Sequence, residues 1–350
     1  MHPDLEEVIA FHEAVVAEGR KALIGYEKEK LLANVALLSE IPTTYDEKSE
    51  RQVNSGNLLL KGVPGVGKTF FGVIIAAVSN AKFARIQGRA DLQPNEIVGF
   101  RMINPVTGDI TTEFGPLASG EVVLLDEINR IPQKSQSGFL EALQDRTITI
   151  GKETYELPAF SFAIATMNPV EIGQGTFPLS EAATDRFAML IDIKYLPPDE
   201  EQKLVQFDFK RVKLNKIMAK ERIIELRSRI KDSVKLHPKL DKYIRRLVCA
   251  SRPFDKEKFD KDRRDLYSPS DLVERFVELG ASPRATICWG RLTRTWALLH
   301  GHRTNVLPED IQSLARHVLG HRLWLKPEAS NENVTVEDVI DQIVEKVAIP

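Results

Sequence analysis

The stretch "KGVPGVGKTF", residues 61–70, places three glycines, a proline, two lysines and a threonine between two apolar runs. From Gly62 to Thr69 it matches the pattern G-x-x-x-x-G-K-[ST] at every fixed position. The run NLLLKG at 57–62 predicts a strand before it, and KTFFGVIIAAVS at 68–79 predicts a helix after it. This strand–loop–helix order is the context in which the pattern forms a phosphate-binding loop.

The residues of this loop have separate tasks in binding a phosphate. Glycines let successive backbone N–H groups turn toward one anion, and the N-terminus of the following helix adds the positive end of its dipole. Lys68 is predicted to contact the β- and γ-phosphates, and the Thr69 hydroxyl to bind Mg²⁺. A simple glycine turn is disfavoured because the pattern is long and stands in the correct context. The predicted nucleotide-binding residues are Gly62, Pro64, Gly65, Val66, Gly67, Lys68, Thr69 and Phe70.

Two adjacent carboxylates follow a second buried strand. The run EVVLLDE at 121–127 predicts that strand, which ends in Asp126 and Glu127. Ligands of open parallel sheets bind at the C-terminal ends of the strands. Asp126 is predicted to hold Mg²⁺ through a water, and Glu127 to polarise the water that attacks the γ-phosphate. Alone, the pair could be two solvated acids, but the phosphate loop upstream favours the catalytic interpretation.

A third buried strand ends in an amide. The run SFAIATMN at 161–168 predicts this strand, and Asn168 could lie between Glu127 and the γ-phosphate and help to hold the water. The alternative is an ordinary turn before Pro169, which is the commoner role of an Asn-Pro pair.

The chain divides into two parts by pattern. Residues 56–196 alternate short apolar runs with helical segments, and AKFARIQG at 81–88 gives a fourth predicted strand. This alternation predicts a parallel sheet with helices on both faces. After the break LPPDEE the pattern is mostly helical. We therefore expect an α/β nucleotide-binding domain over 1–197, with N-terminal helices, and a helical domain over 198–350.

Composition limits the class of protein. The 48 Lys and Arg residues nearly balance the 50 Asp and Glu residues, for a formal net charge of −2, which disfavours a protein that mainly coats nucleic acid. Cys249 and Cys288 form no disulfide framework, as in a reducing compartment. The acidic N-terminus does not resemble a signal peptide, and the apolar run GVIIAAV at 72–78 is too short to span a bilayer. We expect a soluble, cytoplasmic protein with no membrane span.

From the phosphate loop to about residue 198, and again in the helical part, the sequence resembles an AAA+ ATPase of the MoxR family. The segments that carry the resemblance are GVPGVGKT, GFRMINPVTGDITTEFGPLASGEVVLLDEINRIPQKSQSGFLEALQD, ETYELP, IATMNP, GTFPLSEAATDRF, GASPRA and LPEDIQSLARHVLGHRL. The resemblance implies a P-loop AAA+ core with a hairpin inserted in its second helix, followed by an all-helical lid.

The resemblance also implies roles for single residues. It assigns Walker A to 62–69, Walker B to Asp126 and Glu127, sensor 1 to Asn168, an arginine finger to Arg186 and a sensor 2 arginine to Arg284. It places Ile24 and Gly25, within LIGYEKEK, beside the adenine. The implied ligands are ATP and Mg²⁺. The implied assembly is a ring, usually hexameric, with ATP at subunit interfaces, and the implied partners are a von Willebrand A-domain protein and a protein client.

Arginines have a physical task in such a site. Hydrolysis spreads negative charge over the γ-phosphoryl oxygens, and a planar guanidinium matches that charge. Arg186 would reach the nucleotide of a neighbouring subunit, and Arg284, opening a lid helix, would contact phosphate from the lid. Either arginine alone could be a surface salt bridge; the motif context favours the catalytic interpretation.

Two β-hairpins are predicted outside the sheet. FRMIN and DITTEF flank Pro105–Gly108 in the segment 98–117, and RTITIGKETYEL at 146–157 turns around Gly151 and Lys152. Both resemble hairpins of the family and are expected to meet a client or partner, or to pack the ring. The segments 43–56 and 253–279 are longer than the family pattern, which indicates a diverged subfamily.

The sequence therefore predicts an ATP-hydrolysing ring protein that remodels or matures a protein client. The alternative is a nucleic-acid-dependent motor of the MCM or McrB branch, which Lys152 and the basic residues Lys242, Arg245 and Arg246 favour but the overall charge does not. A scaffold that binds ATP without hydrolysis is disfavoured by Glu127.

Overall fold

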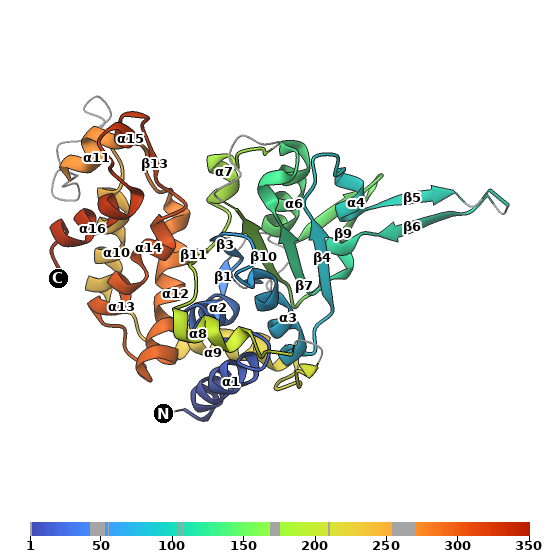
Figure 1. The fold of residues 1–350 in the computed structure, drawn as a ribbon, viewed down its shortest axis with the longest axis horizontal. Helices are drawn as coiled ribbons and strands as arrows, with labels where there is room; N and C mark the ends of the chain where they lie inside the picture. The colour runs from blue at the N-terminus through green and yellow to red at the C-terminus, as the bar shows by residue number, and fades with distance from the viewer. Residues whose placement is uncertain are drawn as a thin grey trace.

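A computed structural model of the chain describes residues 2–42, 53–54, 56–103, 105–106, 108–168, 176–208, 211–253 and 270–350. Its centre is a parallel five-stranded sheet of order β11-β3-β10-β7-β4. The strands are β3 (Leu58–Gly62), β4 (Phe83–Gln87), β7 (Val122–Asp126), β10 (Phe162–Met167) and β11 (Met189–Ile193). The predicted parallel sheet and all four predicted strands are confirmed, and β11 completes the sheet at one edge (Figure 1).

The central strands are apolar along nearly their whole length because helices cover both faces of the sheet. In β3, Leu58 and Leu60 join one apolar cluster and Leu59 joins the other, as expected where successive side chains alternate. The first cluster includes residues of α1 (Pro3–Gly19), α2 (Glu27–Leu38) and α3 (Lys68–Ser79). The second includes residues of α4 (Pro94–Val98), α5 (Pro116–Ser119) and α6 (Gln133–Asp145).

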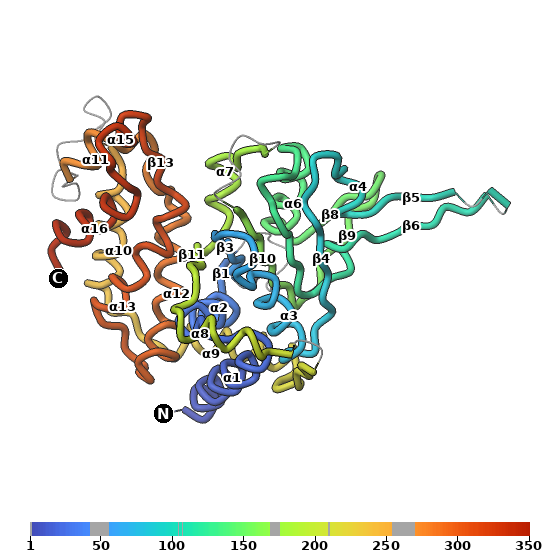
Figure 2. Tube along the Cα trace, viewed as in Figure 1, coloured from blue at the N-terminus to red at the C-terminus, as the bar shows by residue number. Residues whose placement is uncertain are grey.

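Three short elements follow or precede strands of the sheet, and the last of them leads to the helical part. These are the 3₁₀ helix η1 (Ile128–Arg130), α7 (Glu181–Thr184) and α8 (Pro198–Leu204). From α8 the chain runs to α9 (Lys220–Ser233), which packs beside α1 (Figure 2). The rest of the helical part consists of α10 (Pro238–Ala250), α11 (Asp271–Phe276), α12 (Pro283–Gly301), α13 (Pro308–Ser313), α14 (Ala315–Leu319), α15 (Glu328–Asn331) and α16 (Val336–Lys346), with an antiparallel pair of β12 (Val277–Leu279) and β13 (Trp324–Leu325).

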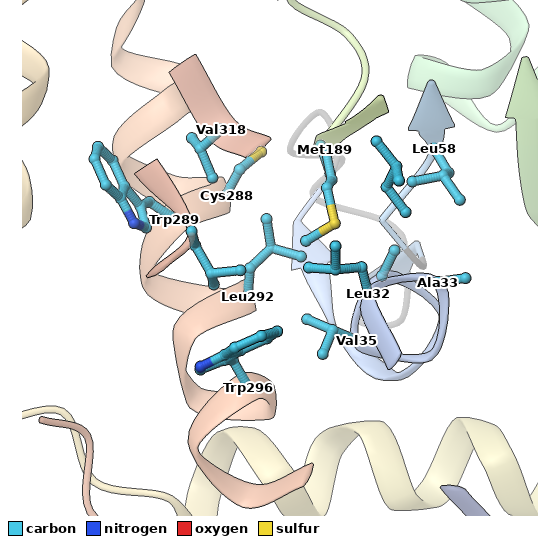
Figure 3. Close-up of a cluster of buried hydrophobic side chains, with 14 of the residues drawn as sticks. Leu32, Ala33, Val35, Leu58, Met189, Cys288, Trp289, Leu292, Trp296 and Val318 are labelled. Carbon is cyan, nitrogen blue, oxygen red and sulfur yellow. The ribbon is translucent and has the colours of Figure 1, made fainter. Parts of the chain in front are cut away.

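Helix α2 lies between the sheet and the helical part. On α12, Leu292 and Trp296 face Leu32 and Val35 of α2, whereas Trp289 lies on the other side of α12, as Figure 3 shows. At the end of α2, the Ser39 hydroxyl donates a buried hydrogen bond of 2.8 Å to the Thr295 hydroxyl of α12. One apolar cluster therefore runs from the sheet through α2 into α12. The boundary at residue 197 remains a prediction, since this cluster contains side chains from both sides of it.

Both predicted hairpins are present. Strand β5 (Gly99–Ile103) pairs with β6 (Ile110–Phe114), and the pair extends away from the body of the molecule (Figure 1). Strand β8 (Thr147–Ile150) pairs with β9 (Glu153–Glu156) close to its base. The two hairpins are joined there by an ion pair of 2.5 Å between Arg101 and Glu153.

The two segments that exceed the family pattern are described only in part. Of 43–56, the structure describes residues 53–54, which form β2 (Val53–Asn54) opposite β1 (Ile41–Pro42), and residue 56. Of 253–279 it describes residue 253 and the stretch from 270 onward. The remainder, and residues 104 and 107 of the long hairpin, lie outside the described residues.

The contact between α12 and its neighbours gives a stability prediction. Trp289 is fully buried, and its indole N–H donates to the carbonyl of Ile311 at 3.0 Å. Trp289→Ala should lower the free energy of unfolding by about 3–5 kcal/mol, because it leaves a cavity and removes a buried hydrogen bond. Urea unfolding followed by circular dichroism measures this. Ile287→Ala on the same helix, where the side chain is 48% exposed, is the control and should change the free energy by less than about 1 kcal/mol. Equal midpoints for the two variants would contradict this description of the core.

Candidate functional site

The loop between β3 and α3 has the backbone that a phosphate-binding loop requires. Gly65 and Gly67 adopt φ angles of +86° and +83°, a left-handed conformation that favours glycine. Gly67 immediately precedes α3, so the backbone N–H groups at the start of this twelve-residue helix face the loop. The Lys68 ammonium group donates to the carbonyls of Gly62 and Val63, both at 2.7 Å, and therefore lies across the inside of the loop.

The carboxylate of Asp126 lies at the C-terminal end of β7 and is nearly buried. It accepts a hydrogen bond of 2.6 Å from the hydroxyl of Thr166 on β10 and another of 2.6 Å from the guanidinium of Arg85 on β4. The Thr166 hydroxyl also accepts from the backbone N–H of Glu127 at 2.9 Å. Thr166 thereby fixes Asp126 and Glu127 relative to the neighbouring strand.

Glu127 adopts a left-handed backbone conformation, with φ at +56°, directly after β7. Its carboxylate accepts a hydrogen bond of 3.0 Å from the side-chain amide of Gln87 and forms an ion pair of 3.4 Å with Arg130. Gln87 ends β4, next to β7 in the sheet. The sequence analysis missed Arg85, Gln87 and Thr166. The signal for them was available, because all three lie near the C-terminal ends of predicted parallel strands.

One cavity of about 300 Å³ brings the predicted phosphate, metal and water-binding residues together. Asn168 lies there at the end of β10, and its backbone carbonyl accepts from the Asn129 side chain at 3.3 Å. Pro169, which follows Asn168 in the sequence, lies outside the described residues. The residues that line the cavity are Pro64, Gly65, Gly67, Lys68, Thr69, Phe70, Asp126, Glu127, Thr166, Met167 and Asn168.

A second cavity of about 230 Å³ adjoins the first and is more apolar. The two share Pro64, Gly65, Gly67 and Phe70 of the loop. Ile24 lines the second cavity, as predicted for an adenine neighbour. Gly25 does not; it forms the turn before α2, with φ at +68°. The lining side chains that the sequence analysis missed include Leu23, Tyr26, Tyr195, Leu204 and Phe207.

Arg186 and Arg284 lie in a third cavity, of about 440 Å³, which shares no lining residue with the phosphate cavity. Arg186 precedes β11, and because β11 runs parallel to β3, this position is at the opposite edge of the sheet from the phosphate loop. Five residues of strand separate the two edges by about 16 Å. Within one chain, the structure therefore does not bring either arginine to the phosphate loop.

Both arginines bind one side chain of α6. The Arg186 Nε donates to the Gln144 side-chain oxygen at 3.0 Å, and Arg284 donates to the same oxygen at 3.4 Å. Arg284 also pairs with Asp185 at 3.1 Å. Gln144 and Asp185 are further members of this cluster that the sequence analysis missed.

The described residues contain neither a membrane-spanning helix nor a metal-binding cluster of acidic, His or Cys side chains. None of the helices within these ranges is both long and apolar enough to cross a lipid bilayer. The same residues contain no cluster of three or more His, Cys, Asp or Glu side chains that could hold a metal ion.

Comparison with known proteins gives the same architecture. Residues 57–189 match the ATPase family associated with various cellular activities (AAA), and residues 270–343 match the AAA lid domain. A crystal structure from Cytophaga hutchinsonii, of a protein assigned as an ATPase, is similar with a TM-score of 0.78 and 32% identity, covering 99% of this chain and 97% of that one.

Two curated relatives cover most of the sequence. Chaperone MoxR1 of Mycobacterium tuberculosis is 34% identical over 299 residues, which are 85% of this chain and 75% of that protein. Protein MoxR of Methylorubrum extorquens is 25% identical over 94% of this chain and 92% of its own. With the sheet order, the phosphate loop and the lid in place, the chain belongs to the MoxR family of AAA+ ATPases.

Proposed function

We propose that this chain binds ATP with Mg²⁺, hydrolyses it within a ring of identical copies, and uses the reaction to remodel a protein client. The observation that carries the proposal is the phosphate cavity, in which Lys68, at the start of α3, meets Asp126 and Glu127, at the end of β7. A chain that only bound a nucleotide would not need a second carboxylate held beside the first. Membership of the MoxR family supports the same conclusion.

ATP fits the two adjoining cavities in a defined orientation. The phosphates would lie in the polar cavity, where the Lys68 ammonium and the N-terminus of α3 provide positive charge. The base would lie in the apolar cavity between Ile24, Tyr26 and Phe207. The loop glycines shared by both cavities would contact the phosphates closest to the base.

The donor set suits Mg²⁺, a hard cation that prefers oxygen ligands and keeps several waters. Thr69 offers a hydroxyl and Asp126 a carboxylate, and both line the phosphate cavity. When bound, the ion would neutralise part of the negative charge of the phosphates. Arg85 pairs with one carboxylate oxygen of Asp126 and Thr166 with the other, so these two side chains set the direction of that carboxylate.

Glu127 is proposed as the residue that orients and polarises the attacking water. Its backbone N–H donates to Thr166, and its carboxylate is held by Gln87 and Arg130. Asn168 would hold the same water from β10. A carboxylate held at a fixed distance from the γ-phosphate can accept a proton as the water attacks.

The arginines are proposed to act between subunits. Arg186 lies at the opposite edge of the sheet from its own phosphate loop, which supports action on the nucleotide of a neighbouring copy. Arg284 shares its cavity and its partner Gln144, which supports the same assignment for it. A guanidinium arriving from a neighbour would stabilise the charge that develops on the γ-phosphoryl group.

The first test separates binding from hydrolysis. Lys68→Ala should lose ATP binding, because the charge that holds the phosphates is removed. Glu127→Gln should bind ATP normally and lower kcat by about 100-fold or more, because Asp126 remains while the base is lost. Calorimetric titration and a phosphate-release assay measure the two effects. Lys134→Ala and Glu141→Gln, both exposed on α6, are the matched controls. Unchanged turnover in Glu127→Gln would refute its role.

The second test asks whether the site is shared. Arg186→Ala should bind ATP but hydrolyse it about 100-fold or more slowly. Mixing it with Lys68→Ala chains should restore part of the activity, since some interfaces then combine an intact Lys68 with an intact Arg186. Lys68→Ala mixed with Glu127→Gln is the control and should restore nothing, because both changes lie on the same side of the interface. If the first mixture stays inactive although subunits exchange, the assignment between subunits is wrong.

The long hairpin is the proposed contact with the client, and a von Willebrand A-domain protein is the proposed partner. Ile103, Val106 and Ile110 near its end are 65%, 90% and 62% exposed, which is unusual for large apolar side chains outside an interface. At its base, β5 directly follows α4, and α5 links β6 to the strand that carries Asp126. The hairpin is thus attached to elements of the phosphate cavity.

Hydrogen exchange tests whether the hairpin responds to nucleotide. Exchange at the backbone amides of 99–103 and 110–114 should differ between Glu127→Gln protein with ATP and the same protein without it, because the strand that carries Asp126 adjoins the base of the hairpin. Lys68→Ala treated in the same way should show no difference. Identical exchange in both states of Glu127→Gln would make the hairpin a static element.

A further inference from the structure

The backbone on both sides of Arg186 is held by one buried side chain of the lid. Arg322 follows α14, and only 1% of its side chain is exposed. Its Nε donates to the Asp185 carboxylate at 3.0 Å, and its Nη2 donates to the carbonyl of Phe187 at 2.5 Å and to that of Asp185 at 3.3 Å. Arg186 itself lies between these two anchored residues.

The second terminal nitrogen of the Arg322 guanidinium connects residues 185–188 to helix α14 of the lid. Its Nη1 donates to the carbonyl of Val318 on α14 at 2.6 Å and to that of Ala188, at the start of β11, at 3.4 Å. Arg322 is therefore hydrogen-bonded to the lid on one side and to residues 185–188 on the other. A planar guanidinium with several donors in fixed directions makes such a connection rigid.

Further lid side chains hold the same segment. His321 is buried, and its Nε2 lies 3.0 Å from the carbonyl of Phe187. Burial lowers the pKa of His321 well below its usual value, so the ring is neutral and Nε2–H donates to that carbonyl. The Asp185 carboxylate also accepts from the Ser282 hydroxyl at 2.8 Å and from Arg284 at 3.1 Å. Three lid side chains thus meet on Asp185 alone.

Stability alone does not require this arrangement. Burying a guanidinium costs desolvation energy that its ion pair offsets only in part, and apolar side chains of similar volume often replace buried ion pairs without loss. What an apolar side chain cannot supply is a set of directed hydrogen bonds to three carbonyls of residues 185–188. These hydrogen bonds hold the backbone on both sides of Arg186 and therefore fix the position of Arg186. The side chain of Arg186 is then directed by Gln144 at 3.0 Å.

We propose that Arg322 is a positioning residue for Arg186, which joins the lid and the arginine finger of one copy into a single body that acts on the neighbour's nucleotide. The proposal rests on the proposed function, because it takes Arg186 to be catalytic between subunits. It adds that the lid of a copy controls catalysis in the adjacent copy through Arg322. A displacement of about 1 Å in a catalytic group can cost about 100-fold in rate.

The test uses the full-length chain and compares Arg322→Gln with Arg186→Ala. Arg322→Gln should lower kcat by about 100-fold while the Kd for ATP changes by less than about 3-fold, because the phosphate cavity is untouched. The double variant should be no slower than Arg186→Ala alone, since both changes remove the same interaction. Arg316→Gln is the matched control: this neighbouring arginine is exposed and pairs with Asp341, and its loss should leave kcat unchanged.

Mixed rings give a result that a general loss of stability would not. Arg322→Gln chains should regain activity with Lys68→Ala chains, which provide an intact arginine finger, and should regain none with Arg186→Ala chains. Recovery with Arg186→Ala, or normal kcat in assembled Arg322→Gln rings while Arg186→Ala is inactive, would overturn the inference alone. Normal kcat in Arg186→Ala would overturn the proposed function and the inference with it.

A second pair of variants covers the case in which Arg322→Gln does not fold. Asp185→Asn keeps the shape of the side chain but removes the charge that Arg322 binds, and Arg322→Lys keeps the charge but loses the directed donors. Both should assemble and lower kcat without weakening ATP binding, with the same pattern in mixed rings. Wild-type kcat in both would overturn the inference.

Discussion

All five strands of the sheet run in the same direction, and this single constraint determines which groups can meet. The C-terminal ends of β3, β4, β7 and β10 lie at one edge, so the phosphate loop, Gln87, Asp126 and Asn168 converge there although they are far apart in the sequence. The N-terminal end of β11 lies at the other edge, and Arg186 stands just before it. The same geometry thus assembles the phosphate cavity within a chain and keeps Arg186 away from it.

Helix α2 lies between the apolar cavity and the lid. The residues just before it, Leu23, Ile24 and Tyr26, line the apolar cavity, and Tyr26 donates to the carbonyl of Lys194 after β11 at 3.0 Å. The helix itself packs against α12 through the cluster in Figure 3. A second connection runs from the lid through Arg322 to Asp185. The lid therefore contacts α2 through apolar packing and the segment just before β11 through charged hydrogen bonds.

The sequence predicted most of the groups that a short pattern can encode. The loop from Gly62 to Thr69 and the Asp126–Glu127 pair are contiguous, and each follows an apolar run that is readable as a strand. Pairs such as Arg85 with Asp126, 41 residues apart, or Arg322 with Asp185, 137 residues apart, depend on strand order and helix packing. The order of the strands and the packing of the helices cannot be predicted from a single sequence by pattern alone. Strand β11 was missed for a related reason, because a polar residue interrupts its short apolar run MLIDI.

The number of projecting hairpins determines how tightly this apolar surface can bind a client. One hairpin offers only a few exposed apolar side chains, and a ribbon of two strands buries too little area for tight association on its own. In a ring, each copy would carry one hairpin on the same face, and a client touching one would be held near the next. The client would then meet the second hairpin at a high effective concentration. Several weak contacts would together give a high overall affinity, while each single contact could still dissociate quickly.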